Sequence, residues 1–171
     1  VVKDSLRRNW QLGTIQLDFS MPERFGLEYI APDGKVARPV MIHRAVLGSF
    51  ERFVGVLIEH YAGYFPLWLA PVQVSVLPIT DSQFDYAKEI ANKLINCGFR
   101  VNLDPRNEKI GYKIREAENK KIPYMIVIGE KEKESGQISV RQHQKGDIGK
   151  FGLNEFIEKL NLQVSKREYY N

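Results

Sequence analysis

The chain has 171 residues, of which 43% are hydrophobic and 27% are charged, a composition typical of a folded globular protein and not of a disordered one. A formal charge of +4 and an isoelectric point near 9.1 favour an anionic partner such as nucleic acid. Cys97 is the only cysteine, which excludes an intrachain disulfide and suits a cytoplasmic protein. The longest apolar run, at 65–71, is far shorter than the roughly 20 residues of a bilayer span, so we expect no membrane segment.

The first part of the chain has the pattern of paired strands. Polar and apolar residues alternate strictly from Thr14 to Phe19, which predicts a strand with one polar and one packed face. Two more strands are predicted at 27–30 and 36–43, joined by a turn at 32–34 that contains proline, aspartate and glycine. These segments are expected to pair antiparallel.

A helix is predicted after Gly48, because apolar residues then recur at spacings of three and four. Ser49 is suited to the N-cap, and Gly63 is suited to the end of the helix. Prolines at 66 and 71 flank a connector, so we expect a boundary near Ala70 that divides the chain into domains at 1–70 and 71–171.

The second domain alternates strands with helices. Strands are predicted at 72–77, 100–103, 124–129 and 137–143, and helices at 82–96, 108–120 and around 156–164, which indicates an α/β fold with a mixed sheet between helices. The charged segment 131–134 is interpreted as a turn. Helical spacing places Lys109, Lys113 and Lys120 on one face, which is either a basic ridge for RNA phosphate or a solvated face balanced by nearby glutamates.

Candidate chemistry lies where the strand ending near His43 passes into the predicted helix. There the guanidinium of Arg52, in the first helical turn, could contact a phosphate. Taken alone, however, Arg52 is more often a solvated helix residue, and His43 is more often a packed histidine than a metal ligand. The wider sequence context has to decide between these readings.

The segment RPVMIHRAVLGSFERF, from Arg38 to Phe53, resembles the third signature motif of class II aminoacyl-tRNA synthetases in its threonyl version. The resemblance continues through 9–19 and 64–71. It implies that 1–70 is the end of an antiparallel catalytic sheet with its motif helix. It also implies the following site residues. ATP would be bound by Gln11, Thr14 and Arg52, with Arg52 also acting in catalysis, and threonine by Gln16 and Ser49.

The resemblance also implies zinc, with His43 as one ligand and the other ligands outside this chain, and ATP with Mg²⁺. An imidazole suits zinc. The physical reason for a metal is selectivity, because an apolar pocket separates threonine poorly from the nearly isosteric valine, whereas a Lewis acid can coordinate the threonine hydroxyl.

The segment 102–115 is similar to the anticodon-binding domain shared by threonyl-, prolyl-, glycyl- and histidyl-tRNA synthetases. It implies an α/β/α domain with a mixed five-stranded sheet at 71–171. The implied anticodon-binding residues are Asn107, Lys109, Arg115, Glu132 and Arg141. Amide, carboxylate and guanidinium groups suit the exposed edges of splayed anticodon bases.

Together these resemblances imply part of an enzyme of the threonyl-tRNA synthetase family, whose partners would be tRNA(Thr), threonine and ATP and which would be a homodimer at full length. A chain that opens on Val1 is interpreted as a fragment that binds tRNA without catalysing the reaction. One alternative is a synthetase-like RNA-binding module that has lost catalysis, although the presence of His43 and Arg52 disfavours it. A prolyl or glycyl enzyme is disfavoured by the same histidine.

Overall fold

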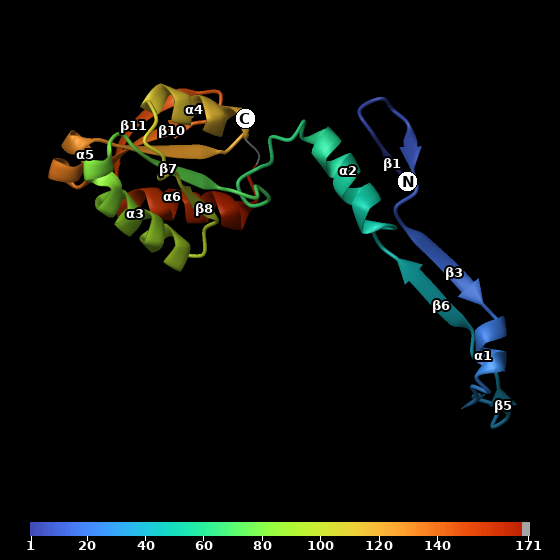
Figure 1. Ribbon diagram of the computed structural model, residues 1–171. Coiled ribbons are helices and arrows are strands. Elements are labelled where there is room, and N and C mark those ends of the chain that lie inside the picture. Colours follow the sequence, from blue (N-terminus) through green and yellow to red (C-terminus); the bar gives the residue numbers. More distant parts are fainter. Residues whose placement is uncertain (169–171) are drawn as a thin grey trace. The chain divides into compact units, whose positions relative to one another are not determined.

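The computed structural model describes residues 1–168 and divides them into two compact units, the first formed by Val1–Ala62 and the second by the residues from Gly63 onward. Each unit has its own sheets and helices (Figure 1). The division falls before the expected boundary at Ala70, so the connector with its prolines lies in the second unit. Among residues 1–168 no helix combines the length and the apolar character needed to cross a bilayer.

The first unit is built from three short antiparallel strand pairs and two helices. The long pair joins β3 (Thr14–Asp18) to β6 (Met41–Ala45) and places Gln16 opposite His43. The other elements are β1 (Val2–Lys3), β2 (Asn9–Trp10), α1 (Ser20–Arg24), β4 (Tyr29–Ile30), β5 (Val36–Ala37) and α2 (Phe50–His60). The strand expected at 36–43 is therefore two strands, β5 and β6, which pair with different partners.

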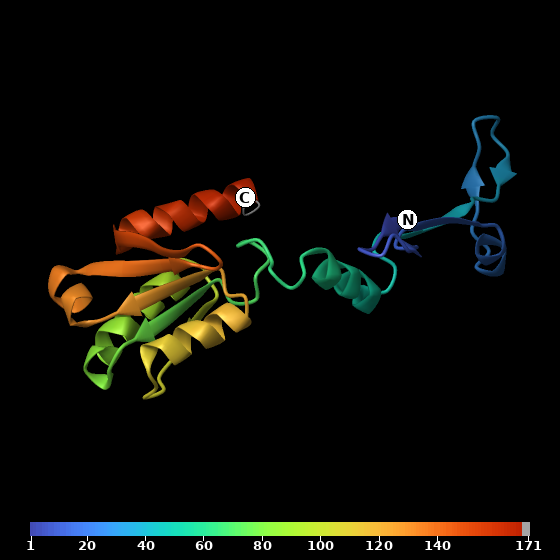
Figure 2. The ribbon, with the colours of Figure 1, turned by 90° about the horizontal axis from the view of Figure 1, so that it is seen from above.

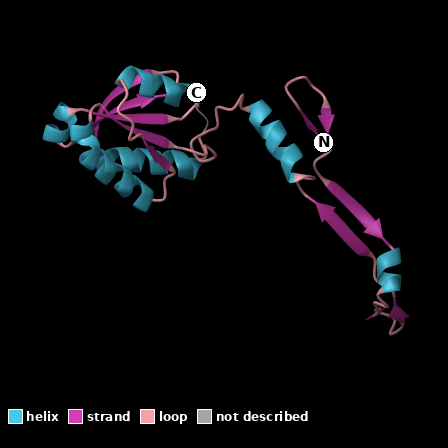
Figure 3. Ribbon diagram, viewed as in Figure 1, coloured by secondary structure: helices cyan, strands magenta, loops and turns pink. Residues whose placement is uncertain are grey.

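The second unit is a five-stranded mixed sheet in the order β11-β10-β9-β7-β8. Figure 3 shows its strands in magenta among helices in cyan. Strands β7, β8 and β9 are parallel, and β10 runs antiparallel to β9 and β11. The strands are β7 (Val74–Pro78), β8 (Val101–Leu103), β9 (Tyr124–Ile128), β10 (Gln137–Gln142) and β11 (Gly146–Gly152). The helices are the 3₁₀ turn η1 (Asp81–Gln83), α3 (Phe84–Asn96), α4 (Ile110–Asn119), α5 (Glu130–Ser135) and α6 (Leu153–Lys166).

Helices cover both faces of this sheet, so the expected α/β/α arrangement is confirmed. Figure 2 shows α4 and α6 on opposite sides of the strands. On one face the buried residues of α3 and α6 pack on β7, β9 and β10, with Phe156 edge-on to Tyr124 at a ring separation of 5.4 Å. On the other face Ala117 of α4 packs with Leu77 and Met125. Helices α3, α4 and α6 are where the sequence period placed them, because each carries one apolar stripe that the sheet buries.

Two elements of the second unit differ from the expectation. Residues 130–135 form helix α5 and not a turn. Residues 146–152 form β11, which completes the sheet and which no sequence pattern indicated.

Candidate functional site

The strand-to-helix corner of the first unit is a close backbone contact. Ser49 caps helix α2, and its Oγ accepts the backbone N–H of Arg52 at 3.1 Å. Gly48 has φ +65°, and a Cβ at that position would lie 3.0 Å from the carbonyl oxygen of Leu12. A side chain there would be strained and crowded, so glycine is required for the corner to approach the strand beside it.

The Arg52 side chain lies across this corner. Its Nη1 donates to the carbonyl oxygen of Gln11 at 3.2 Å, and its guanidinium lies over the ring of Trp10, 5.8 Å from the centroid. The ring of Trp10 is held in turn, because its Nε1 donates to Oδ2 of the buried Asp4 at 2.9 Å. Burial would raise the pKa of Asp4, but hydrogen bonds from Trp10 and Arg8 lower it to about 2.

The polar face of β3 lies beside this corner. Directly opposed residues of an antiparallel pair share a face, so His43 lies on the same face as Thr14, Gln16 and Asp18. The ring Nε2 of His43 is 2.9 Å from Asp18 Oδ2. The backbone N–H of Met21 and the His43 ring together hold the pKa of Asp18 below its usual value.

The residues of the strand-to-helix corner do not form a complete zinc site. Structural and catalytic zinc sites in proteins have three or four protein ligands. His43 offers one exposed imidazole, and no group of three or more potential ligands of the His, Cys, Asp or Glu type lies together within residues 1–168. The first unit therefore brings together fewer than the three protein ligands that a zinc site needs, with Asp18 as the carboxylate beside His43.

In the second unit two of the expected base-reading residues follow the ends of parallel strands, and the third lies within β10. Parallel strands end at the same edge. Asn107 follows β8 and Glu132 follows β9, with β7 between these two strands. Arg141 of β10 stands opposite Met125 of β9, whose side chain packs on the face that α4 covers.

The Glu132 carboxylate is buried and held by three donors. It accepts hydrogen bonds from the backbone N–H of Gly129 at 3.1 Å and from Ser139 Oγ at 2.8 Å, and Lys150 Nζ lies 3.0 Å away. Burial would raise the pKa of Glu132, but these contacts hold it below its usual value. A carboxylate that is ionised at neutral pH is thereby fixed in one orientation.

Arg141 is the opposite case. Among residues 1–168, its buried Nε is one of the side-chain atoms with no hydrogen-bond partner. A buried donor of this kind is costly unless an acceptor reaches it.

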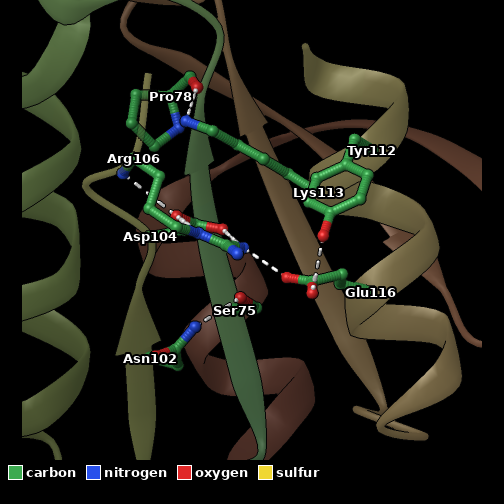
Figure 4. Close-up of polar contacts among 8 residues, drawn as sticks. All are labelled: Ser75, Pro78, Asn102, Asp104, Arg106, Tyr112, Lys113 and Glu116. Atoms are coloured by element: carbon green, nitrogen blue, oxygen red, sulfur yellow. Dashed lines mark hydrogen bonds and ion pairs between the residues drawn. The ribbon is translucent and has the colours of Figure 1, made fainter. Parts of the chain in front are cut away.

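The prediction that Lys109, Lys113 and Lys120 share one exposed face of α4 is wrong for Lys113. Lys113 is only 3% exposed, and its Nζ donates to the carbonyl oxygen of Pro78 at 2.9 Å, as the close-up shows (Figure 4). Lys109 precedes the first residue of α4 and is exposed, as are Arg115 and Lys120. Helical spacing alone placed Lys113 with the other lysines, whereas the carbonyl at the end of β7 provides an acceptor that the sequence pattern does not reveal.

Asp4 and Trp10 are the residues near the first site that the sequence analysis missed. Their only signal in the sequence is an aspartate six positions before a tryptophan, and that spacing has no local meaning. The contact depends on β1 pairing with β2, both of which are two-residue strands.

Two family models match the chain, one in each unit. A family model described as an anticodon binding domain matches residues 73–163. A model of the tRNA synthetase class II core domain (G, H, P, S and T) matches residues 1–61. Both families were expected from the motifs.

The similar proteins are threonine–tRNA ligases. That of Clostridium tetani is 58% identical over 166 residues, covering 97% of this chain and 26% of the relative. That of Clostridium acetobutylicum is 60% identical over the same length, with the same coverage. The chain therefore spans about a quarter of the length of these relatives.

Solved structures agree in fold. The RNA-binding domain of threonyl-tRNA synthetase from Cryptosporidium parvum has a TM-score of 0.82 at 40% identity and covers 94% of this chain and 41% of that one. A putative threonyl-tRNA synthetase from Aeropyrum pernix has a TM-score of 0.63 at 30% identity and covers 96% of this chain and 39% of that one. The chain belongs to the anticodon-binding domain family, in the form carried by the threonyl-tRNA synthetases that it resembles.

Proposed function

We propose that this chain is part of a threonine–tRNA ligase, in which the second unit reads the anticodon of tRNA(Thr) and the first unit completes the site that activates threonine with ATP. The observation that carries this proposal is the similarity to threonine–tRNA ligases, because it spans both units and 97% of the chain. In domain terms, 1–70 would be the end of the catalytic domain and 71–171 the anticodon-binding domain.

In the first unit, we propose that Arg52 binds and acts on ATP. The hydrogen bond to the Gln11 carbonyl and the stacking on Trp10 support this role, since they hold the guanidinium in one place. Gln11 and Thr14 would complete the ATP contacts, with Mg²⁺ accompanying the nucleotide. Gln16 and Ser49 would bind threonine.

We propose His43 as one zinc ligand of the complete enzyme. The exposed imidazole opposite Gln16 supports this assignment, because it would place the metal beside the amino-acid site. Zinc bound there would supply the Lewis acid that selects the threonine hydroxyl over the methyl group of valine.

In the second unit, we propose that Asn107, Glu132 and Arg141 read anticodon bases and that Lys109 and Arg115 contact the surrounding RNA. The unpartnered Nε of Arg141 and the fixed carboxylate of Glu132 support base recognition. The exposure of Lys109 and Arg115 supports contact with phosphate. The complete enzyme would be a cytoplasmic homodimer.

Aminoacylation by the full-length protein that contains this chain is the decisive test. We expect it to charge tRNA(Thr) with threonine, to bind zinc and to reject valine, and we expect the 171-residue chain alone to bind tRNA(Thr) without charging it. A full-length protein that binds tRNA(Thr) but forms no threonyl-tRNA would overturn the proposal and favour a binding module without catalysis.

A further inference from the structure

Arg106 joins the end of a strand to the middle of a helix. Its Nε donates to Asp104 Oδ1 at 2.9 Å, and its Nη2 donates both to Asp104 Oδ2 at 2.6 Å and to Glu116 Oε2 at 2.5 Å. Figure 4 shows the guanidinium between these carboxylates. Asp104 directly follows β8, and Glu116 lies on α4, so a single side chain links two elements of secondary structure.

Both ends of this link are anchored. The Asp104 side chain is only 6% exposed, its backbone N–H donates to the carbonyl oxygen of Val76 in β7 at 3.0 Å, and its Oδ1 also accepts the backbone N–H of Arg106 at 3.1 Å. On the helix, Tyr112 donates its hydroxyl to Glu116 at 3.2 Å, and its ring lies 5.8 Å from the guanidinium carbon. Bidentate geometry of this kind fixes orientation as well as distance.

The contacts of Arg106 disfavour a direct role in binding phosphate. One guanidinium faces two carboxylates, so the cluster carries no excess positive charge that would attract RNA phosphate. The next residue in the chain, Asn107, is exposed and lies between this link and the first residue of α4, Ile110. The path of Asn107 is therefore set by the residue immediately before it.

We propose that Arg106 is a positioning residue for anticodon recognition, which fixes the segment between β8 and α4 so that Asn107 meets one base in one orientation. This inference rests on the proposed function. It requires the planar fork of arginine, because the single ammonium of a lysine cannot reach three carboxylate oxygens from one plane. Arg106 would thus affect discrimination between anticodon bases without contacting the RNA itself.

Binding of the 171-residue chain to four tRNAs tests this inference: tRNA(Thr), and three variants that each have one anticodon base changed. At the base that Asn107 reads, we expect Arg106→Gln and Arg106→Lys to reduce discrimination by about 10-fold, in line with the loss of one oriented base contact. The slope of log Kd against log salt should stay unchanged, because no phosphate contact is lost. Adding Asn107→Ala to Arg106→Gln should have little further effect on discrimination.

Lys93→Ala is the matched control, since it removes one exposed cation from α3 and should change neither discrimination nor folding. Circular dichroism establishes that each variant is folded. If the Arg106 variants fail to fold, Glu116→Gln takes their place, because it removes only the helix end of the link, and it should reduce discrimination at the same base.

Two sets of results separate this inference from the proposed function. If the wild-type chain does not prefer tRNA(Thr) over its variants, the proposed function is wrong. If the wild-type chain discriminates and folded Arg106 or Glu116 variants discriminate equally well, only the role of Arg106 is refuted. A loss that is equal for all four tRNAs, with a salt slope smaller by about one ion or with full rescue by Arg106→Lys, would identify a phosphate contact and overturn the inference.

Discussion

Cationic side chains around the sheet of the second unit have distinct environments, and these decide what each can bind. Lys113 donates to a backbone carbonyl in the interior, and Arg106 is neutralised by two carboxylates. Lys109 and Arg115 are exposed, and Arg141 has a buried Nε without a hydrogen-bond partner within residues 1–168. Lys109 and Arg115 are placed to bind an external anion, whereas Lys113 and Arg106 are not, so the number of basic residues in the sequence overstates the number available to RNA.

For Arg141, we predict that substitution by alanine weakens binding of tRNA(Thr) to the 171-residue chain by about 1–3 kcal/mol, the range for a base-reading arginine. The loss should be largest for the cognate anticodon, because a directional contact is removed. Filter binding with tRNA(Thr) and an unrelated tRNA measures both effects. Equal binding of wild type and variant to both tRNAs would contradict the prediction, and Lys93→Ala is the control for lost charge.

For His43, we predict that substitution by alanine in the full-length protein lowers the zinc content, because one protein ligand of the metal is removed. Loss of an orienting or ligating group typically costs metal affinity by 10-fold or more. Metal analysis of purified protein measures the stoichiometry. The control is His60→Ala, which changes another histidine of the same unit; unchanged zinc content in the His43 variant would disprove the ligand role.

Part of the candidate site follows from local sequence, and part does not. The cap by Ser49 and the position of Arg52 in the first helical turn are local features, which spacing along the chain predicts. The support of Arg52 by Trp10 and Asp4 is not local, since it needs two short strands to pair first. Pairing between short strands has little signal in a single sequence.

At the scale of elements, predictability followed the strength of the periodic pattern. Helices α3 and α6 each bury a regular apolar stripe, and both were expected. Helix α5 is a charged six-residue segment with no such stripe. Strand β11 contains Gly146, Gly149 and Gly152, and glycine is poor in strands, so its place in the sheet is set by pairing with β10.

The link between β8 and α4 should make stability depend on pH. Hydrogen bonds from Arg106 hold the pKa values of Asp104 and Glu116 below their usual range. A carboxyl group with a lowered pKa stabilises the fold above its unfolded pKa, about 4, and this stabilisation is lost as the pH falls through that region. We therefore predict that the melting temperature of the wild type falls between pH 5 and pH 3. The melting temperature of Glu116→Gln should fall less over the same interval.

Thermal unfolding followed by circular dichroism at each pH measures this difference. Arg106 and Lys113 are the cations that lower the pKa of Asp104, and Lys120 and Tyr112 act with Arg106 on Glu116. The control is Glu158→Gln on α6, which removes an exposed carboxyl outside the cluster. If Glu116→Gln and wild type lose the same stability between pH 5 and pH 3, the link does not contribute to acid sensitivity.

For the whole molecule, the two units differ in how much apolar surface they bury. Both clusters of buried hydrophobic residues lie in the second unit. In the first unit Leu12 and Pro22 are the only buried apolar residues, and helix α2 has no buried residue. Residues such as Ile15 and Phe50 are instead 67% and 70% exposed.

We predict that residues 63–171 expressed alone fold cooperatively and that residues 1–62 alone do not, because only the former buries a core. Removing the buried aromatic ring of Phe156 by substitution with alanine should destabilise the second unit by about 3–5 kcal/mol. Urea unfolding followed by circular dichroism measures both. The exposed Leu162→Ala on the same helix is the control, and a similar cost for the two variants would contradict the assigned core.

The strand order also constrains when the second unit can fold. Strand β7 is formed first along the chain yet lies inside the sheet, and its partner β9 becomes available only after two helices and β8 have followed. The hairpin of β10 and β11 is local but lies at one edge of the sheet. It can pair with the rest of the sheet only through β9, so it cannot join the sheet before β9 has formed. A nascent chain emerging from the ribosome would thus be unable to form the sheet until Tyr124–Ile128 is released. Refolding should also be slower than that of a helical bundle of equal length.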